Sequence, residues 1–180
     1  EEVTPREGDV VITIDPGQAF GTGTHETTRL VLAELDARVR GGESVLDAGC
    51  GSGILSIGAI LLGAKSAICV DVDPDAVHVT DENAELNGVA DRIRASTTPV
   101  ARLRRRFDLV LANIESRVLV PMAKTLAARV APGGTLVLSG LLAPEEDTVR
   151  KAYRGLGLRW LATRTDGDWI ALTFRAGRAS

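Results

Sequence analysis

Short apolar runs alternate along this chain with stretches whose apolar residues recur at helical spacing. The runs at 45–48, 67–70, 107–112 and 135–138 have the length and composition of buried strands. Between them lie stretches such as 27–39, where Leu30, Val31 and Leu35 share one helical face. Strands that alternate with helices predict an α/β fold with a mainly parallel sheet.

The same patterning predicts the remaining elements. We expect short strands over 9–14 and 92–95, and helices over 54–62, 75–86, 118–130 and 144–154. Asp73 is expected to cap the second of these helices, with Pro74 as its first residue. The turn residues 165–168 separate strand-like segments at 159–164 and 169–174, which predicts a closing hairpin and therefore an antiparallel last strand.

Length, charge and cysteine content narrow the class of protein. The 180 residues fit one domain, 1–180. A net charge of −3 gives no overall field that attracts nucleic acid, and the basic run 102–106 is interpreted as a solvated loop rather than a contact for RNA or an acidic partner. Cys50 and Cys69 suggest neither a disulfide framework nor a metal site, which favours a reducing, cytoplasmic location. We expect no signal peptide and no membrane-spanning segment, since no apolar run is long enough to cross a membrane.

A glycine turn, 47–53, follows the strand at 45–48 and precedes a helix. Its glycines allow a ligand to approach the backbone closely, although a tight turn without a ligand is the alternative. A dinucleotide fingerprint would have Gly or Ala where Ile54 stands, so the turn favours a nucleotide-like cofactor without a pyrophosphate. Asp71 ends the next strand, 20 residues after Gly51, where an acid accepts hydrogen bonds from ribose hydroxyls. The alternative for Asp71 is a solvated strand end.

The pattern D-x-G-x-G-x-G at 47–53 resembles motif I of class I S-adenosylmethionine methyltransferases. The segment 15–28, D-P-G-Q-A-F-G-T-G-T-H-E-T-T, resembles a signature of the ribosomal protein L11 methyltransferase family, and 71–74, 112–114 and 138–142 agree with it. The resemblance implies a Rossmann-like class I methyltransferase sandwich with a mostly parallel seven-stranded sheet. It also implies S-adenosyl-L-methionine as cofactor and, as acceptor, the lysine or N-terminal amines of a protein such as ribosomal protein L11.

The resemblance also implies site residues. Asp47 would lie near the amino-acid end of the cofactor, and Asn113, at the end of a central strand, would contact the cofactor and position the substrate amine. Phe20 would cover the cofactor by cation–π attraction or, equally, fill the core of its own loop. The complete set of expected cofactor contacts is Phe20, Thr28, Asp47, Gly49, Gly51, Asp71 and Asn113.

Two departures from the family pattern leave alternatives open. Family members have a substrate-recruiting domain ahead of this segment, so the 180 residues alone are expected to methylate full-length L11 poorly, or to act on another amine. Glu115 stands where the family commonly has a small or apolar residue. It either attracts a cationic amine or is the N-terminal acidic residue of the following helix, which we favour. The rival functions are a nicotinamide dehydrogenase and a cofactor-binding module without catalysis.

Overall fold

One seven-stranded sheet organises the part of the chain that this computed structural model describes, residues 6–15 and 23–178. The strands follow the order β3-β2-β1-β4-β5-β7-β6. They are β1 (Ser44–Ala48), β2 (Ser66–Val70), β3 (Ile93–Ser96), β4 (Phe107–Asn113), β5 (Val130–Leu142), β6 (Leu158–Asp166) and β7 (Trp169–Ala176). The pairs from β3 to β5 are parallel, and β7 is antiparallel to both β5 and β6. The predicted α/β class, edge strand and antiparallel hairpin are confirmed.

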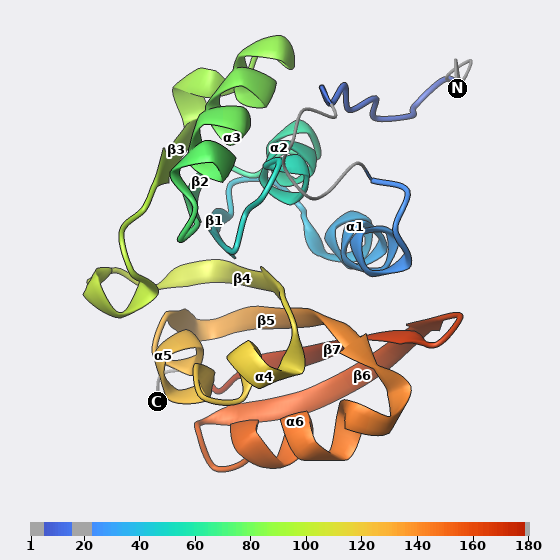
Figure 1. Ribbon diagram of the computed structural model, residues 1–180, viewed down its shortest axis with the longest axis vertical. Helices are drawn as coiled ribbons and strands as arrows, with labels where there is room; N and C mark the ends of the chain where they lie inside the picture. The colour runs from blue at the N-terminus through green and yellow to red at the C-terminus, as the bar shows by residue number, and fades with distance from the viewer. Residues whose placement is uncertain (1–5, 16–22, 179–180) are drawn as a thin grey trace.

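Helices cover both faces of the sheet (Figure 1). On one face lie α1 (Glu26–Arg38), α2 (Ile54–Leu61) and α3 (Pro74–Leu86), and on the other lie α4 (Ser116–Leu119), α5 (Ala123–Ala127) and α6 (Glu146–Tyr153). Single 3₁₀ turns occur at Ala90–Arg92, Val100–Arg102 and Ala143–Glu145. Each face has its own buried core, with Leu35 and Ile57 in one and Leu126 and Tyr153 in the other. Burial of these apolar side chains holds the three layers together.

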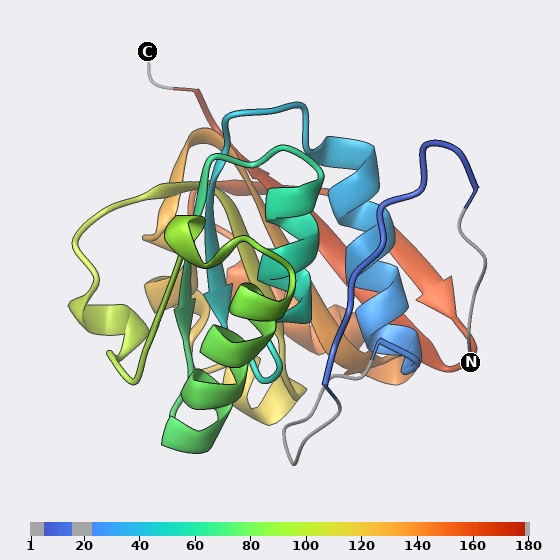
Figure 2. The ribbon, with the colours of Figure 1, turned by 90° about the horizontal axis from the view of Figure 1, so that it is seen from above.

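The segment 9–14, which we expected to be a strand, joins no sheet. Its backbone is held by Asn83 of α3 and by Asn87, the residue that follows α3. The Asn87 side chain accepts from Thr13 N at 2.9 Å and donates to Thr13 O at 2.6 Å. The Asn83 side chain accepts from the neighbouring Asp15 N at 2.9 Å. These bonds satisfy backbone groups that a strand ladder would otherwise satisfy. Figure 2 shows this segment running alongside the helices rather than beside a strand. The strand prediction here is wrong.

The predicted helix over 118–130 is also wrong, because two short helices, α4 and α5, occupy this region. Pro121 lies between them, and proline lacks the N–H that a continuous helix needs. The following strand is longer than predicted, since β5 already pairs with β4 at Phe107–Val130 and continues to Leu142. The helix predicted over 144–154 begins with a 3₁₀ turn, and its α-helical part is α6.

Parallel strands place their carboxyl ends at one edge of the sheet, and the glycine turn after β1, Asp71 after β2 and Asn113 at the end of β4 therefore meet there. Crevices at this edge hold the ligands of open α/β sheets. Among the described helices, none is long and apolar enough to cross a membrane.

Candidate functional site

The turn after β1 has a backbone that only glycine adopts readily. Gly49, Gly51 and Gly53 have φ angles of +75°, +54° and +79°. A Cβ atom on Gly49 would lie 2.7 Å from Ile114 Cγ2, closer than real Cβ atoms approach other carbon atoms. The turn therefore packs tightly against Ile114 at the end of β4, where a residue with a side chain would not fit.

The amide groups of this turn are used within the protein. Gly49 N and Cys50 N donate to Val70 O at 2.8 and 3.2 Å, and Gly53 N donates to Cys50 O at 2.8 Å. Gly51 N donates to Asp71 Oδ2 at 3.0 Å. A pyrophosphate at such a turn is bound by backbone amides that point at it. With these four amides already engaged, the turn is unsuited to a dinucleotide.

Helix α3 fixes the turn from behind. Thr80 Oγ1 donates to Gly51 O at 3.0 Å, and Asn83 Nδ2 donates to Ser52 O at 2.9 Å. Both side chains are fully buried. A Cβ atom on Gly53 would lie 2.8 Å from Thr80 Cγ2, so the turn and the helix are in close contact. The shape of the turn is thus set before any ligand binds.

Asp71 is oriented by two backbone amides. Its Oδ2 accepts from Gly51 N at 3.0 Å and its Oδ1 accepts from Asp73 N at 3.1 Å. A carboxylate offers about four lone-pair positions, so about two remain for a ligand. Asp71 is partly exposed and lines the cleft, where those lone pairs can accept from a pair of hydroxyl groups.

A cleft of about 470 Å³ runs along the ends of β1, β2 and β4. Five expected contacts line it together: Thr28, Gly49, Gly51, Asp71 and Asn113. Its remaining walls are mainly apolar and include Val72, Ile114, Val118, Met122 and the segment 97–100. Val72 is 96% exposed, so an apolar side chain stands open at the rim. An elongated ligand with an apolar body and a few polar groups suits this lining.

Thr28 and Asn113 supply further polar groups to the cleft. Neither side chain forms a hydrogen bond with another described residue, although both line the cleft. The backbone beside Asn113 is tightly set, because Ile114 N donates to Ser139 O at 3.1 Å and Gly140 packs against the backbone of Ile114. The hydroxyl and the amide are therefore held in place with bonding capacity to spare.

Asp47 lies outside the lining of the cleft. Its side chain is fully buried, its Oδ2 accepts from Ser56 Oγ at 2.9 Å, and its Oδ1 has no partner among the described residues. Burial raises the pKa of Asp47 to about 6, against the hydrogen bond from Ser56, and the nearby charge of Asp71 adds to the rise. The carboxyl group therefore joins the end of β1 to α2, and its contact with a cofactor stays a prediction.

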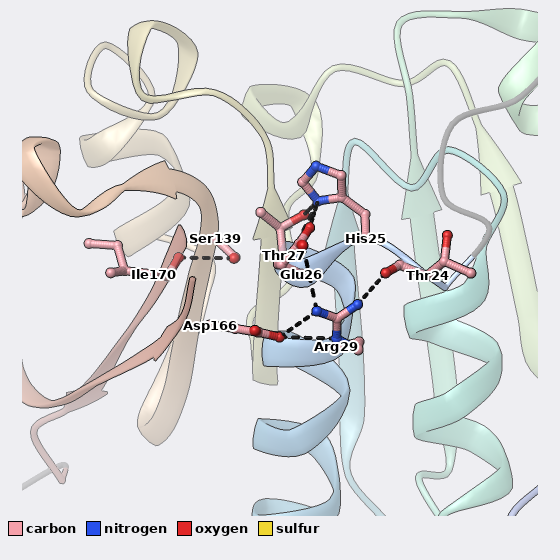
Figure 3. A network of polar contacts seen from close by, with 8 residues as sticks. All are labelled: Thr24, His25, Glu26, Thr27, Arg29, Ser139, Asp166 and Ile170. Carbon is pink, nitrogen blue, oxygen red and sulfur yellow. Dashed lines mark hydrogen bonds and ion pairs between the residues drawn. The ribbon is translucent and has the colours of Figure 1, made fainter. Parts of the chain in front are cut away.

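A second polar network joins the start of α1 to the β6–β7 hairpin (Figure 3). Arg29 donates to Thr24 O and, through Nε and Nη2, to Asp166 Oδ2 at 3.0 and 2.8 Å. His25 caps α1, accepting from Thr27 N at 3.3 Å, and its ring meets Trp169 edge-on at 5.0 Å. These contacts fix the end of the 15–28 segment, and with it Thr28.

Phe20, the remaining expected contact, lies outside the described residues. Glu115 is the residue that precedes α4; its side chain is exposed and forms an ion pair with Arg117. Among the described residues, no group of three His, Cys, Asp or Glu side chains is placed to hold a metal ion.

With this geometry established, comparison with known proteins identifies the family. The family model "Ribosomal protein L11 methyltransferase (PrmA)" matches residues 1–177. The chain belongs to the ribosomal protein L11 methyltransferase family. Curated members from Citrifermentans bemidjiense and Geobacter sulfurreducens are each 50% identical over 97% of this chain. A member from Sorangium cellulosum is 46% identical over 98% of this chain. The chain spans 58%, 58% and 62% of the lengths of these three relatives.

One solved structure agrees with membership of the L11 methyltransferase family, and a second shares the fold. A crystal structure of ribosomal protein L11 methylase from Lactobacillus delbrueckii subsp. bulgaricus has a TM-score of 0.90 and 29% identity, covering 99% of this chain and 92% of that one. A putative RNA methyltransferase from Pyrococcus horikoshii has a TM-score of 0.75 at 22% identity, covering 89% of this chain and 87% of that one, and it supports the fold alone. The predicted class I methyltransferase architecture is thereby confirmed.

Several residues of the cleft in this family member were missed by sequence reasoning. The segment 97–100 follows the edge strand β3, and Val118 and Met122 lie in or beside the short helices that replace the predicted long one. A signal was available for the second group, because Pro121 breaks the helical pattern. For Thr97 to Val100 no local pattern indicates that the loop folds over the cleft.

Proposed function

We propose that this cleft binds S-adenosyl-L-methionine and that residues 1–180 form a methyltransferase domain that N-methylates amino groups of a protein such as ribosomal protein L11. The proposal rests on the hydrogen bonding of the glycine turn. Its amides at Gly49, Cys50, Gly51 and Gly53 donate within the protein, while Asp71 keeps bonding capacity toward the cleft. This arrangement suits a nucleoside cofactor without phosphates.

The residues fit the parts of this cofactor. Asp71 accepts hydrogen bonds from the two ribose hydroxyls. Val72 and the segment 97–100 provide a largely apolar slot for the adenine ring. Gly49 lines the cleft and has no side chain, which lets the ligand approach the backbone. Thr28 and Asn113 bring a hydroxyl and an amide to the methionine end.

When bound, S-adenosylmethionine supplies a methyl group carried on a positively charged sulfur. The chain's own contribution is to position and desolvate the amine that receives it. Asn113 accepts a hydrogen bond from the amine through its amide oxygen, and the apolar walls of Ile114, Val118 and Met122 exclude water. A lysine amine has a pKa of about 10.4, and desolvation lowers it toward the neutral form that reacts. Positioning of the two groups provides the remaining rate enhancement.

A cytoplasmic location and ribosomal protein L11 as partner belong to the same proposal. The names of the relatives and the solved L11 methylase support the choice of acceptor. Cys50 and Cys69 are both free and buried, which suits a reducing compartment. The end of β4 reads Asn113-Ile114-Glu115-Ser116, without the prolines and aromatic residue of enzymes that methylate planar amides or bases, and this favours an aliphatic amine.

The test measures transfer of a radiolabelled methyl group from S-adenosylmethionine to L11, to amine-bearing peptides and to small amines, with the wild type, Asn113→Ala and the exposed control Lys65→Ala. We expect transfer to amines, and a fall of roughly 10²-fold or more in kcat for Asn113→Ala because misplacement of the amine costs about that much. Lys65→Ala should match the wild type. Cofactor binding without transfer to any amine would favour the non-catalytic module, and unchanged turnover in Asn113→Ala would remove Asn113 from the reaction.

A further inference from the structure

Charges are segregated on the half of the sheet formed by β4, β5, β7 and β6. Seven acidic residues occur from residue 99 onward, and six of them lie at the carboxyl edge: Glu115, Glu145, Glu146, Asp147, Asp166 and Asp168. The exception, Asp108, accepts from Ser44 N and Oγ at 2.9 and 2.8 Å, on the side of β1. Of the described residues from 99 onward, Asp108 is therefore the one acidic residue at the opposite edge, where β4, β5 and β6 begin and β7 ends.

Two adjoining hollows of about 370 and 750 Å³ lie at this amino edge. They share Gly157, Leu158, Ala176, Gly177 and Arg178, and no acidic residue is among the described residues that line them. We call their five basic residues the amino-edge cluster: Arg106, Lys124, Arg159, Arg175 and Arg178. In Figure 1 the end of β7 and the start of β6 lie on this side, away from the β6–β7 hairpin.

Ion pairs engage three other basic residues in this half of the chain. Arg117, Arg150 and Arg164 each form an ion pair with a glutamate. None of the five cluster residues forms an ion pair with a described carboxylate. Their charge is therefore uncompensated on a protein whose net charge is −3.

Two of the arginines also face one another across the sheet. Arg159 of β6 and Arg175 of β7 are directly opposite in the antiparallel ladder, and both are exposed. Directly opposed residues of an antiparallel pair point to the same face, and like charges there destabilise the sheet. This repulsion is a cost to folding that an anion bound between the two guanidinium groups removes.

We propose that the amino-edge cluster binds the phosphate backbone of RNA. Arginine dominates the cluster, and its planar fork pairs with phosphate oxygens through two hydrogen bonds. Gly157 and Gly177 line both hollows, which leaves room for a phosphate close to the main chain. No described aromatic side chain lines either hollow, so the contact is made to the backbone rather than to stacked bases. A run of cations without intervening acids suits an evenly charged polyanion better than a protein surface of mixed charge.

The placement allows RNA and cofactor to bind together. The cofactor cleft lies at the carboxyl ends of β1, β2 and β4, and the amino-edge cluster lies at the opposite edge of the sheet. The proposal therefore does not depend on the proposed methyltransferase function, because RNA binding is measured without cofactor.

The test measures the affinity of the chain for a fluorescein-labelled RNA duplex by anisotropy, at salt concentrations from about 50 to 200 mM. The variants are Arg159→Glu and the control Arg94→Glu, which makes the same charge change on the exposed face of β3. For Arg159→Glu we expect RNA binding weaker by on the order of tenfold. The slope of log affinity against log salt concentration should also become shallower by about one or more, since each phosphate contact contributes about one to that slope. Arg94→Glu should bind within about twofold of the wild type.

A stability measurement separates loss of binding from loss of folding. Arg159→Glu replaces a repulsive pair with an attractive one, so its melting temperature at low salt should equal or exceed that of the wild type while its RNA affinity falls. Equal losses of affinity in both variants, or no binding by the wild type at physiological salt, would overturn the proposal. Tighter binding of polyglutamate than of RNA would also overturn it, and would point to an acidic protein partner.

Discussion

Gly140 supports the cofactor cleft from behind, and replacing it by alanine gives the sharpest test of the site's geometry. The residue lies at an irregularity of β5 between Leu138 and Leu141, with a φ of +81°. A Cβ atom there would lie 2.8, 2.8 and 2.9 Å from the C, O and N atoms of Ile114. These atoms are main chain, so the contact cannot be relieved by rotating a side chain. The backbone next to Asn113 must move instead.

The magnitude follows from two costs. A left-handed backbone costs a residue with a Cβ about 1–2 kcal/mol, and overpacking a filled interior costs about 1–3 kcal/mol more. Gly140→Ala should therefore lower the free energy of unfolding by about 2–5 kcal/mol, a large part of the roughly 5–15 kcal/mol of a typical domain. Because relief of the contact displaces Ile114 and Asn113, cofactor affinity should fall by on the order of tenfold or more, about 1.4 kcal/mol.

Gly155→Ala is the matched control. Gly155 has a φ of +77°, and a Cβ atom there would meet nothing within 4 Å, so this variant carries the backbone cost without the overlap. Urea unfolding and calorimetric titration with S-adenosylmethionine measure both effects. Gly155→Ala should lose about 1–2 kcal/mol of stability and no affinity. If Gly140→Ala behaves like Gly155→Ala in both assays, the close support of Ile114 by β5 is refuted.

Two buried carboxyl groups should titrate with opposite signs. Burial alone would raise the pKa of Glu34, but hydrogen bonds from Arg38, Thr173 and Arg164 outweigh it and hold the pKa below its usual 4.5. Glu34→Gln should therefore lower the free energy of unfolding in urea by about 3 kcal/mol at pH 7, as breaking a buried ion pair does. This loss should shrink as the pH falls below 4.5, and a loss independent of pH would contradict the ionic role of Glu34. Burial raises the pKa of Asp47 from 3.8 to about 6, so the folded state loses stability as pH rises through this interval. Asp47→Asn without cofactor should therefore gain up to about 3 kcal/mol above pH 6 and little near pH 4; equal stability of the two proteins at both pH values would contradict a buried charge.

The strand–turn–helix units of the fold follow from local chemistry, and the sequence predicts them well. The apolar run before Asp47 and the one before Asp71 are too short for helices and form β1 and β2. Asp73 and Pro74 mark the start of α3, and the Asp73 side chain accepts from the Asp75 amide as a cap does. These features depend on residues a few positions apart, so the pattern alone suffices.

Features that depend on distant residues were not predictable from the sequence. The segment 9–14 has a strand-like pattern, but Asn87 reaches its backbone from 74 positions away and takes the place of a neighbouring strand. Asp166 lies 137 positions from Arg29, with which it helps hold the end of the 15–28 segment. Five of the seven expected site residues meet in one cleft. Ligands of open α/β sheets bind at the carboxyl ends of the strands, and the sequence pattern predicts which residues lie at those ends. Asp47 fits the motif, but its burial outside the cleft depends on the packing of α2.

The central claim, that the cleft binds S-adenosylmethionine, is tested most directly by calorimetric titration of the chain with S-adenosylmethionine and, separately, with NAD. The titrations compare the wild type with Asp71→Ala. Asp108→Ala, at the opposite edge of the sheet, is the control. We predict that the wild type binds S-adenosylmethionine and not NAD, because Gly49, Cys50, Gly51 and Gly53 have no amide left for a pyrophosphate. Asp71→Ala should weaken binding by about 1.5–3 kcal/mol, the contribution of charged hydrogen bonds, and Asp108→Ala should leave it unchanged. Binding of NAD, or an Asp71→Ala variant with wild-type affinity for S-adenosylmethionine, would contradict the account of this cleft.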